Sequence, residues 1–257
     1  MSWAIGLTGG MFGGLVGLGG GVVIVPMLTK YLKLTQHKAH GTSLVALIFT
    51  GLVGSMPYLV NQRLDIPSAL VLSFFAMATA HLGAKYCRIL PEFLLRRYFG
   101  LFLMAMAFFI LTKPYLNPLT HPIVGVGKWM VLAGIGLATG FLSGLMGIGG
   151  GALMIACMVL LLGYDQHLAQ GTSLLAMIPG SIIGGWTHWK NGFVALNCLG
   201  GLIGGIILGA LIGGICAQYI SGGILRAIFA GVLTWLGYRY IKSSYSKETS
   251  DDSQCRL

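Results

Sequence analysis

The chain carries one apolar pattern twice, at a fixed offset of 130 residues. The first copy reads GLVGLGGG over 14–21 and QHKAHGTSL over 36–44, and the second reads GLMGIGGG over 144–151 and QHLAQGTSL over 166–174. Residues 6–61 align with 136–191 without an insertion, and about 21 of roughly 56 positions are identical. A duplicated apolar unit interrupted by glycines is typical of secondary transporters.

Composition indicates that lipid is the solvent. The 257 residues are 56% hydrophobic and only 9% charged, and the mean hydropathy is +0.84. A soluble domain needs more charged surface to cover so many apolar side chains. We therefore predict an all-α, polytopic membrane protein in a lipid bilayer. The formal net charge is +10, and we expect the Lys and Arg residues behind it to lie in cytoplasmic loops. Attraction of an anionic substrate is the alternative explanation of this charge. No nucleic-acid partner is expected.

The 41 glycines fit a membrane protein, because glycine lets helices approach closely in lipid. One series recurs every four residues and predicts a closely packed seam on one helix face: Gly201, Gly205, Gly209 and Gly213. Aromatic side chains near helix ends predict interfacial anchors: Tyr58, Trp186 and Trp189.

Each copy holds four apolar stretches. The predicted organisation is a first repeat over 1–112, a proline-containing linker over 113–128, a second repeat over 129–242 and a polar cytoplasmic tail over 243–257. The stretches are 3–32, 41–60, 66–86 and 94–112, then 129–163, 171–188, 193–217 and 222–241.

The first stretch of each repeat is too long for one crossing. Trp129 to Gly163 contains no charge over about 35 positions, which as one helix would span about 52 Å against a hydrocarbon core of about 30 Å. A hairpin of two half-helices that turns at the triple glycine fits better, because glycine supplies the backbone freedom for the turn. Each repeat is then a re-entrant hairpin plus three transmembrane helices.

Loop charge favours this hairpin. If each first stretch crosses once, Lys and Arg divide about 8 to 8 between the two sides; if each is re-entrant, the division is about 12 to 4. The second division predicts two inverted repeats with both termini in the cytoplasm.

The glycine turns are the first candidate substrate-binding site. A half-helix that begins at the turn leaves its first N–H groups unpaired in the membrane, and an anion satisfies both these donors and the positive helix end. Close helix crossing is the alternative role. The residues are Gly19, Gly20 and Gly21, with Gly149, Gly150 and Gly151.

The second candidate is the repeated Gly-Thr-Ser motif, at the expected start of an apolar helix. Its hydroxyl and N–H groups either bind substrate oxygens or cap the helix. The residues are Gly41, Thr42 and Ser43, with Gly171, Thr172 and Ser173.

Further polar residues are candidates for a proton relay or for lining the pathway. Histidine titrates near working pH, and an ionisable residue inside an apolar stretch is a functional candidate. The residues are Gln36, His37, His81, Gln166 and His167, together with Asn61 and Asn191, for which helix C-capping is the commoner use.

Enzymatic chemistry is not expected. The chain has no phosphate-binding lysine motif and no dinucleotide fingerprint, and it contains only 6 acidic residues. Its five cysteines show no paired or metal-type spacing. We therefore expect no enzyme activity, no metal and no cofactor.

The two paired motifs, each present twice at equal spacing, resemble the TauE/SafE sulfite exporter family, also called the toluene-sulfonate uptake permease family, over about residues 3–241. The resemblance implies a multipass permease of the bacterial inner membrane for a small sulfur-containing anion such as sulfite, thiosulfate or a sulfonate. The two copies differ where His40 matches Gln170 and Pro26 matches Ala156, so the two half-sites are not equivalent.

Three functions remain open at this point. The leading hypothesis is a secondary transporter working by alternating access, with H⁺ as the coupling ion if there is one. The alternatives are an anion channel and a membrane subunit that delivers sulfur species to an enzyme, for which Cys157 is the candidate thiol. The oligomeric state is left open.

Overall fold

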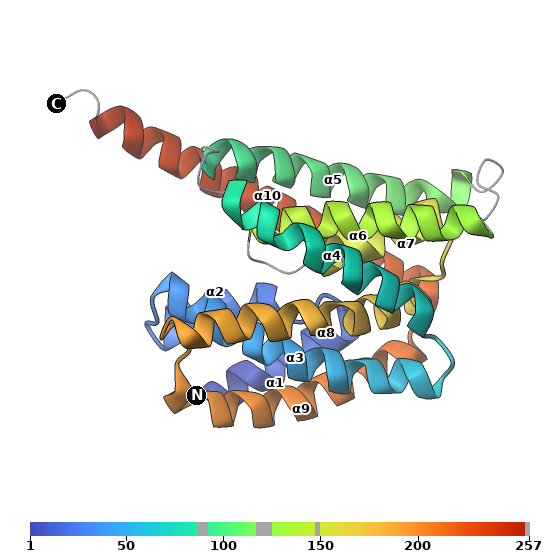
Figure 1. The fold of residues 1–257 in the computed structure, drawn as a ribbon, viewed down its shortest axis with the longest axis horizontal. Coiled ribbons are helices and arrows are strands. Elements are labelled where there is room, and N and C mark those ends of the chain that lie inside the picture. The colour runs from blue at the N-terminus through green and yellow to red at the C-terminus, as the bar shows by residue number, and fades with distance from the viewer. Residues whose placement is uncertain (87–91, 117–124, 147–149, 255–257) are drawn as a thin grey trace.

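The computed structural model describes residues 1–86, 92–116, 125–146 and 150–254. Within these ranges the chain forms ten helices that run side by side as a bundle (Figure 1). They are α1 Ser2–Val16, α2 Gly21–Tyr31, α3 Gln36–Val60, α4 Ile66–Tyr86, α5 Glu92–Leu116, α6 Val126–Met146, α7 Gly151–Leu161, α8 Gln166–Lys190, α9 Leu196–Tyr219 and α10 Gly222–Gln254. The prediction of an all-α protein is confirmed.

Several helices have the length and composition of membrane spans. Within the described ranges, three satisfy both criteria: His37–Val60, Val126–Ser143 and Leu196–Tyr219. Large apolar side chains also cover the outer face of the bundle, including Phe74 (65% exposed) and Phe108 (64% exposed). Such exposure is favourable when the surrounding medium is lipid.

The first long apolar stretch is interrupted at its glycines, as predicted. Helix α1 ends at Val16, and Gly17, Gly19 and Gly20 all take left-handed backbone angles, with φ of 79°, 77° and 77°. A side chain would be strained at each of these positions. In the second stretch α6 ends at Met146 and α7 begins at Gly151 after the N-cap Gly150, while residues 147–149 lie outside the described ranges.

Helix α2 folds back along α1 after this break. A Cβ on Gly13 would lie 2.6 Å from the Gly20 nitrogen, and Thr8 lies against Met27, with 3.5 Å between Oγ1 and Sδ. In the second copy a Cβ on Gly150 would lie 3.2 Å from the carbonyl oxygen of Thr139. Both interrupted stretches are therefore helical hairpins.

The predicted glycine seam packs against α1. Cβ atoms on Gly205 and Gly209 of α9 would overlap the carbonyl oxygens of Trp3 and Leu7. Helices α6 and α4 meet in the corresponding way, since a Cβ on Gly136 would lie 2.9 Å from the Leu72 carbonyl oxygen. Each hairpin thus packs on a helix of the other sequence half.

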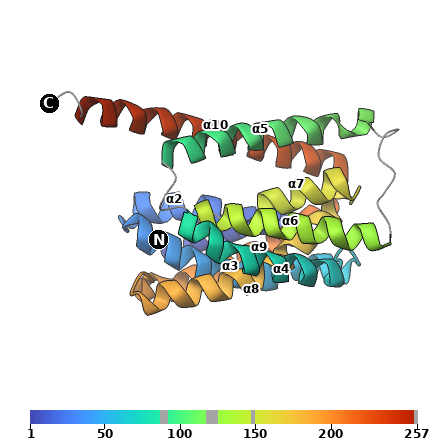
Figure 2. The ribbon, with the colours of Figure 1, turned by 45° about the horizontal axis from the view of Figure 1, so that its top comes forward.

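The bundle has two ends, here called the first and the second end. The first end contains the start of α1, the 32–35 loop and the 191–195 loop; there a Cβ on Gly201 would lie 2.6 Å from Ser2 Oγ, and the His37 and Phe193 rings are 5.5 Å apart. The second end contains the 61–65 loop, the start of α6, the 162–165 loop and the 220–221 turn. The chain's N-terminus and the C-terminal end of α10 both lie towards the first end, on the left of Figures 1 and 2.

The glycine seam generates a stability prediction. We expect Gly209→Ala to lower the midpoint of thermal unfolding in detergent by roughly 3–10 °C, because the new methyl group overlaps the Leu7 carbonyl. Gly200→Ala is the matched control in the same helix, where a Cβ has nothing within 4 Å. Equal melting of the two variants would show that the α1–α9 approach does not support the fold.

Candidate functional site

The two glycine breaks lie side by side in the interior. A Cβ on Gly151 would lie 2.7 Å from Met177 Sδ and 3.5 Å from the Gly17 carbonyl oxygen, and one on Gly19 would lie 3.2 Å from Met177 Cε. All four residues are buried. Two turns that are 130 residues apart in the chain therefore meet around one methionine of α8. Gly149 lies outside the described residues.

Each break leaves a helix N-terminus without a side-chain cap. Gly20 is the N-cap of α2 and Gly150 that of α7, and neither position provides a side-chain hydrogen bond to the helix. The first N–H groups of a helix have no acceptor within it, and the helix dipole adds a partial positive charge there. The site can therefore offer buried N–H donors to a negatively charged ligand.

Polar side chains surround the first break. The Tyr58 hydroxyl lies 2.9 Å from the Gly14 carbonyl oxygen and 3.2 Å from Gln170 Oε1, and Ser173 donates to the Gly17 carbonyl oxygen at 2.9 Å. Tyr58 is fully buried, so the prediction that it is an interfacial aromatic is wrong: its hydroxyl is held in the core.

Gln170 is the most informative residue of this group. Its side chain is fully buried, it lies against Gly17, and its Nε2 has no hydrogen-bond partner among the described residues. If its amide is flipped, one N–H can donate to the Tyr58 hydroxyl while the other stays unpaired. In either orientation, a buried N–H is left without an acceptor beside the first break.

The Gly-Thr-Ser motif joins the two sequence halves. Thr42 Oγ1 accepts the Ala195 N–H at 3.0 Å, and Thr172 Oγ1 accepts the Asp65 N–H at 3.1 Å. The glycine before each threonine lies against a backbone carbonyl of the other half. A Cβ on Gly41 would overlap the Phe193 carbonyl oxygen, and a Cβ on Gly171 would lie 2.5 Å from the Arg63 carbonyl oxygen. The contacted residues in the two halves again differ by 130 in number.

Helix capping by this motif does not occur, because both helices begin earlier than expected. Helix α3 starts at Gln36 after the N-cap Thr35, and α8 starts at Gln166 after the N-cap Asp165. Ser43 donates to the His40 carbonyl one turn earlier, at 3.0 Å. Substrate binding by the motif stays a prediction, to which the structure adds a role in holding the halves together.

The two motif histidines have different surroundings. His167 is 3% exposed, and its Nδ1 lies 3.1 Å from Asp165 Oδ2 while its Nε2 lies 3.0 Å from the Ala217 carbonyl oxygen. It ties the start of α8 to the end of α9. His37 is exposed at the first end, where its ring contacts the Phe193 ring in a tilted arrangement. A proton role for either one stays a prediction.

The other candidates are distributed along the bundle. Asn61 and Asn191 are the C-caps of α3 and α8, and Asn61 Nδ2 donates to the Pro57 carbonyl at 2.7 Å, as C-capping requires. Gln166 is fully buried in the first turn of α8. The side chains of Gln36 and His81 lie outside the described part of the structure.

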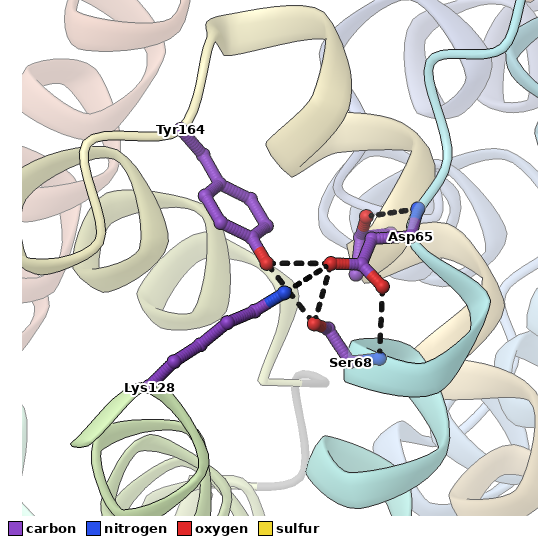
Figure 3. Close-up of polar contacts among 5 residues, drawn as sticks. Asp65, Ser68, Lys128 and Tyr164 are labelled. Carbon is purple, nitrogen blue, oxygen red and sulfur yellow. Dashed lines mark hydrogen bonds and ion pairs between the residues drawn. The ribbon is translucent and has the colours of Figure 1, made fainter. Parts of the chain in front are cut away.

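One polar cluster at the second end is not evident from the sequence (Figure 3). Asp65 Oδ2 accepts from Lys128 Nζ at 2.8 Å, from the Tyr164 hydroxyl at 2.7 Å and from Ser68 Oγ at 2.7 Å. Partial burial alone would raise the pKa of the Asp65 carboxyl, but the hydrogen bonds from Lys128, Ser68 and Tyr164 lower it to about 2. The only signal in the sequence is that Asp65 is one of 6 acidic residues in the chain.

The Asp65 cluster has no polar counterpart in the other half. The residues at the equivalent positions, 130 away, are Leu34, Ala195 and Cys198. The hydrogen bond to a Gly-Thr-Ser threonine is thus made at both ends of the bundle, and among the described residues the Asp65–Lys128 ion pair adds to it at the second end. The two ends therefore differ in what holds them together.

The threonine bridge generates the next prediction. Thr172→Val should lower the free energy of unfolding by about 1–3 kcal/mol, because the Asp65 N–H loses its acceptor. Thr187→Val, in the same helix, is the control, since the Thr187 hydroxyl is exposed and bonds only within α8. Thermal unfolding in detergent measures both, and equal effects would contradict a bridging role.

The ion pair generates a pH-dependent prediction. Because the pKa of Asp65 is lower in the folded protein than its usual 3.8, the carboxylate stabilises the fold above about pH 4, and this contribution is lost as the pH falls towards 2. Asp65→Asn should therefore melt below the wild type at pH 6, and the difference should shrink below pH 4 and nearly vanish at about pH 2. Combining it with Lys128→Met should give less than additive destabilisation. A pH-independent difference would contradict the assignment.

Comparisons with known proteins agree on one family. The family described as "Sulfite exporter TauE/SafE" matches residues 2–240. The chain is similar to the "Probable membrane transporter protein YunE" of Bacillus subtilis (31% identity over 212 residues, 74% of this chain and 78% of the relative). It is also similar to YdhB of the same organism, likewise described as a probable membrane transporter protein (28% over 192 residues, 72% and 76%), and to one from Methanocaldococcus jannaschii (25% over 187 residues, 70% and 68%). No solved structure matches the chain significantly. The chain belongs to the sulfite exporter TauE/SafE family, and is a multipass membrane protein of a transporter family rather than an enzyme.

Proposed function

We propose that this protein is a secondary transporter of small sulfur oxyanions, such as sulfite, thiosulfate or an organosulfonate, and that it works by alternating access. The observation that carries the proposal is the meeting of the two glycine breaks around Met177, where two uncapped helix N-termini are buried together. The substrate class comes from the family description.

The donors at the breaks suit a transported anion. Unpaired N–H groups are costly in an apolar interior, and an anion with several oxygens can satisfy several of them at once. The groups with unpaired donors are the first backbone amides of the half-helices and the Gln170 amide, all of them uncharged. The Tyr58 and Ser173 hydroxyls beside them already donate to the Gly14 and Gly17 carbonyls. Uncharged donors can bind an oxyanion without the tight ion pair that would slow its release.

An inverted arrangement of the two repeats is part of the proposal. It is supported by contacts that recur at an offset of 130: Gly41 with Phe193 and Gly171 with Arg63, or Gly136 with Leu72 and Gly6 with Leu202. The first hairpin starts at the first end and the second hairpin at the opposite end, so both reach the breaks from opposite sides. Together with the loop charges, this arrangement supports the proposal that both termini lie in the cytoplasm.

The glycine seams define which helices move together in this proposal. Since α1 packs on α9 and α6 packs on α4 through backbone contacts, neither pair can slide apart without losing its seam. Each moving unit then combines the hairpin of one repeat with a long helix of the other, as α1, α2 and α9, or α6, α7 and α4. Helices α3 and α8 lie between these units and carry the Gly-Thr-Ser motifs.

We propose H⁺ as the coupling ion. Measurements of anion flux distinguish a carrier from the two alternatives. A carrier saturates at low anion concentration, whereas a channel shows conductance well above carrier turnover. Delivery to a partner enzyme would require a reactive thiol, but Cys157 of α7 packs against the largest apolar cluster.

Uptake and efflux of radiolabelled sulfite, thiosulfate and methanesulfonate in proteoliposomes, with and without a pH gradient, tests the proposal. We expect saturable flux of at least one anion. Absence of saturable flux for all of them would refute it.

Paired glycine variants localise the flux to the first break. Gly20→Ala should reduce transport roughly tenfold or more, because Gly20 has φ of 77° and its Cβ would overlap the Gly9 carbonyl. Gly150→Ala should reduce transport less, because Gly150 has φ of −79° and its Cβ would lie 3.2 Å from the nearest atoms of Thr139. Gly192→Ala, also at positive φ but in open space, controls for strain alone. Equal transport by all three would contradict a functional break.

A further inference from the structure

Buried polar side-chain atoms without partners, most of them donors, collect at the second end of the bundle. Among the side chains that the structure describes, these atoms have no hydrogen-bond partner: Arg63 Nη1, Gln166 Nε2 and Oε1, Gln218 Nε2 and Oε1, and Arg226 Nε. They come from the 61–65 loop, the first turn of α8, the last turn of α9 and the first turn of α10. A buried amide without a partner destabilises a fold by about 1–3 kcal/mol, so a set of them calls for an explanation.

One face of α8 connects this end with the breaks. Gln166, Gln170, Ser173 and Met177 follow one another at spacings of four, three and four residues, which places them on one side of the helix. All four are buried: Gln166, Gln170 and Ser173 are 0% exposed and Met177 is 7% exposed. Met177 touches both breaks, Ser173 binds the Gly17 carbonyl, and Gln170 lies against Gly17.

Arg63 adds positive charge beside this face. The Arg63 backbone N–H donates to the Tyr58 carbonyl at 2.7 Å, and the Tyr58 hydroxyl contacts Gln170. The neighbouring cation Lys128 is already paired with Asp65. Arg63 is thus a charge at the second end that the Asp65 cluster does not neutralise.

We propose that Gln166 forms an outer oxyanion subsite, one helical turn before Gln170, and that the anion passes between the second end and the breaks along the Gln166–Gln170–Ser173 face of α8. This inference deepens the proposed function and rests on it. The oxyanion supplies acceptors for the unpaired Nε2 donors of Gln166 and Gln170. The step from Gln166 to Gln170 advances it by about 6 Å along the helix.

The subsite has a thermodynamic signature that a structural amide would not show. Replacing Gln166 with methionine removes two unpaired polar atoms at nearly constant volume, so the anion-free protein should melt at the same temperature or higher. The same change should weaken anion binding about 5–30-fold and reduce the thermal stabilisation that the anion gives. A residue that only supports the fold would show the opposite pattern.

The experiment measures binding and transport separately. Binding of thiosulfate and sulfite to the purified protein in detergent is followed by calorimetry and thermal shift, with chloride as the reference anion, for wild type, Gln166→Met, Gln166→Glu and Gln170→Met. Gln62→Met and Gln62→Glu are matched controls, because Gln62 is exposed at the same end of the bundle. We expect Gln166→Glu to abolish binding by charge repulsion, while both Gln62 variants bind like the wild type.

Two outcomes would overturn the inference. One is a Gln166→Met protein that binds the anions within twofold of wild type; the other is one that melts lower and loses binding only in proportion to its stability. Proteoliposome flux separates this inference from the proposed function. Binding that depends on Gln166 without any transport would support the subsite and refute the transporter. Transport at the wild-type rate in the Gln166 variants would support the transporter and refute the subsite.

Discussion

The arrangement of this protein depends on backbone N–H groups that are buried where water cannot reach them. A helix that begins inside an apolar bundle exposes its first donors to a medium that offers no acceptor. Both glycine breaks create this situation, and the fold brings them together around Met177 instead of separating them. Surrounding hydroxyl groups satisfy carbonyls of the first break, as Tyr58 does at Gly14 and Ser173 at Gly17, whereas Gln170 keeps an unpaired N–H. The balance is an excess of donors, which favours a ligand that accepts hydrogen bonds.

Glycine serves two distinct purposes in this chain. At Gly17, Gly19 and Gly20 it permits left-handed backbone angles, which allow the first hairpin to turn within a few residues. In α9 it permits close approach, because the helix surface is reduced to backbone where α1 crosses it. The first use places the site, and the second holds each hairpin to a helix of the other sequence half. In the proposed alternating access, each hairpin then moves together with the helix of the other half on which it packs.

The sequence predicts much of the fold because the repeat is direct evidence of shared structure. The interruption at 19–21, the hairpin expected from the charge-free run of 129–163 and the seam from Gly201 to Gly213 all follow from spacing and length. The role of the Gly-Thr-Ser motif does not, because α3 and α8 begin five residues before it, and its partners, Ala195 and Asp65, are more than 100 residues distant in the chain. Asp65 with Lys128 and Tyr164 is equally hidden, since long-range ion pairs leave no local pattern. Tyr58 is buried although an aromatic residue near a helix end is typical of the membrane interface. Residues of the other half, such as Gln170, cover it, and the local sequence does not show this contact.

The central claim is that an oxyanion binds between the two breaks, and one structural measurement addresses it most directly. Crystals of the protein grown with selenite, the heavier analogue of sulfite, would show the selenium by anomalous scattering. We expect a selenium peak beside Gly19–Gly21 and Gly150–Gly151, placed so that the selenite oxygens accept hydrogen bonds from the first amides of α2 and α7 and from the Gln170 side chain. A map in which residues 17–21 continue as one helix, or in which selenium binds only at the surface of the bundle, would contradict it.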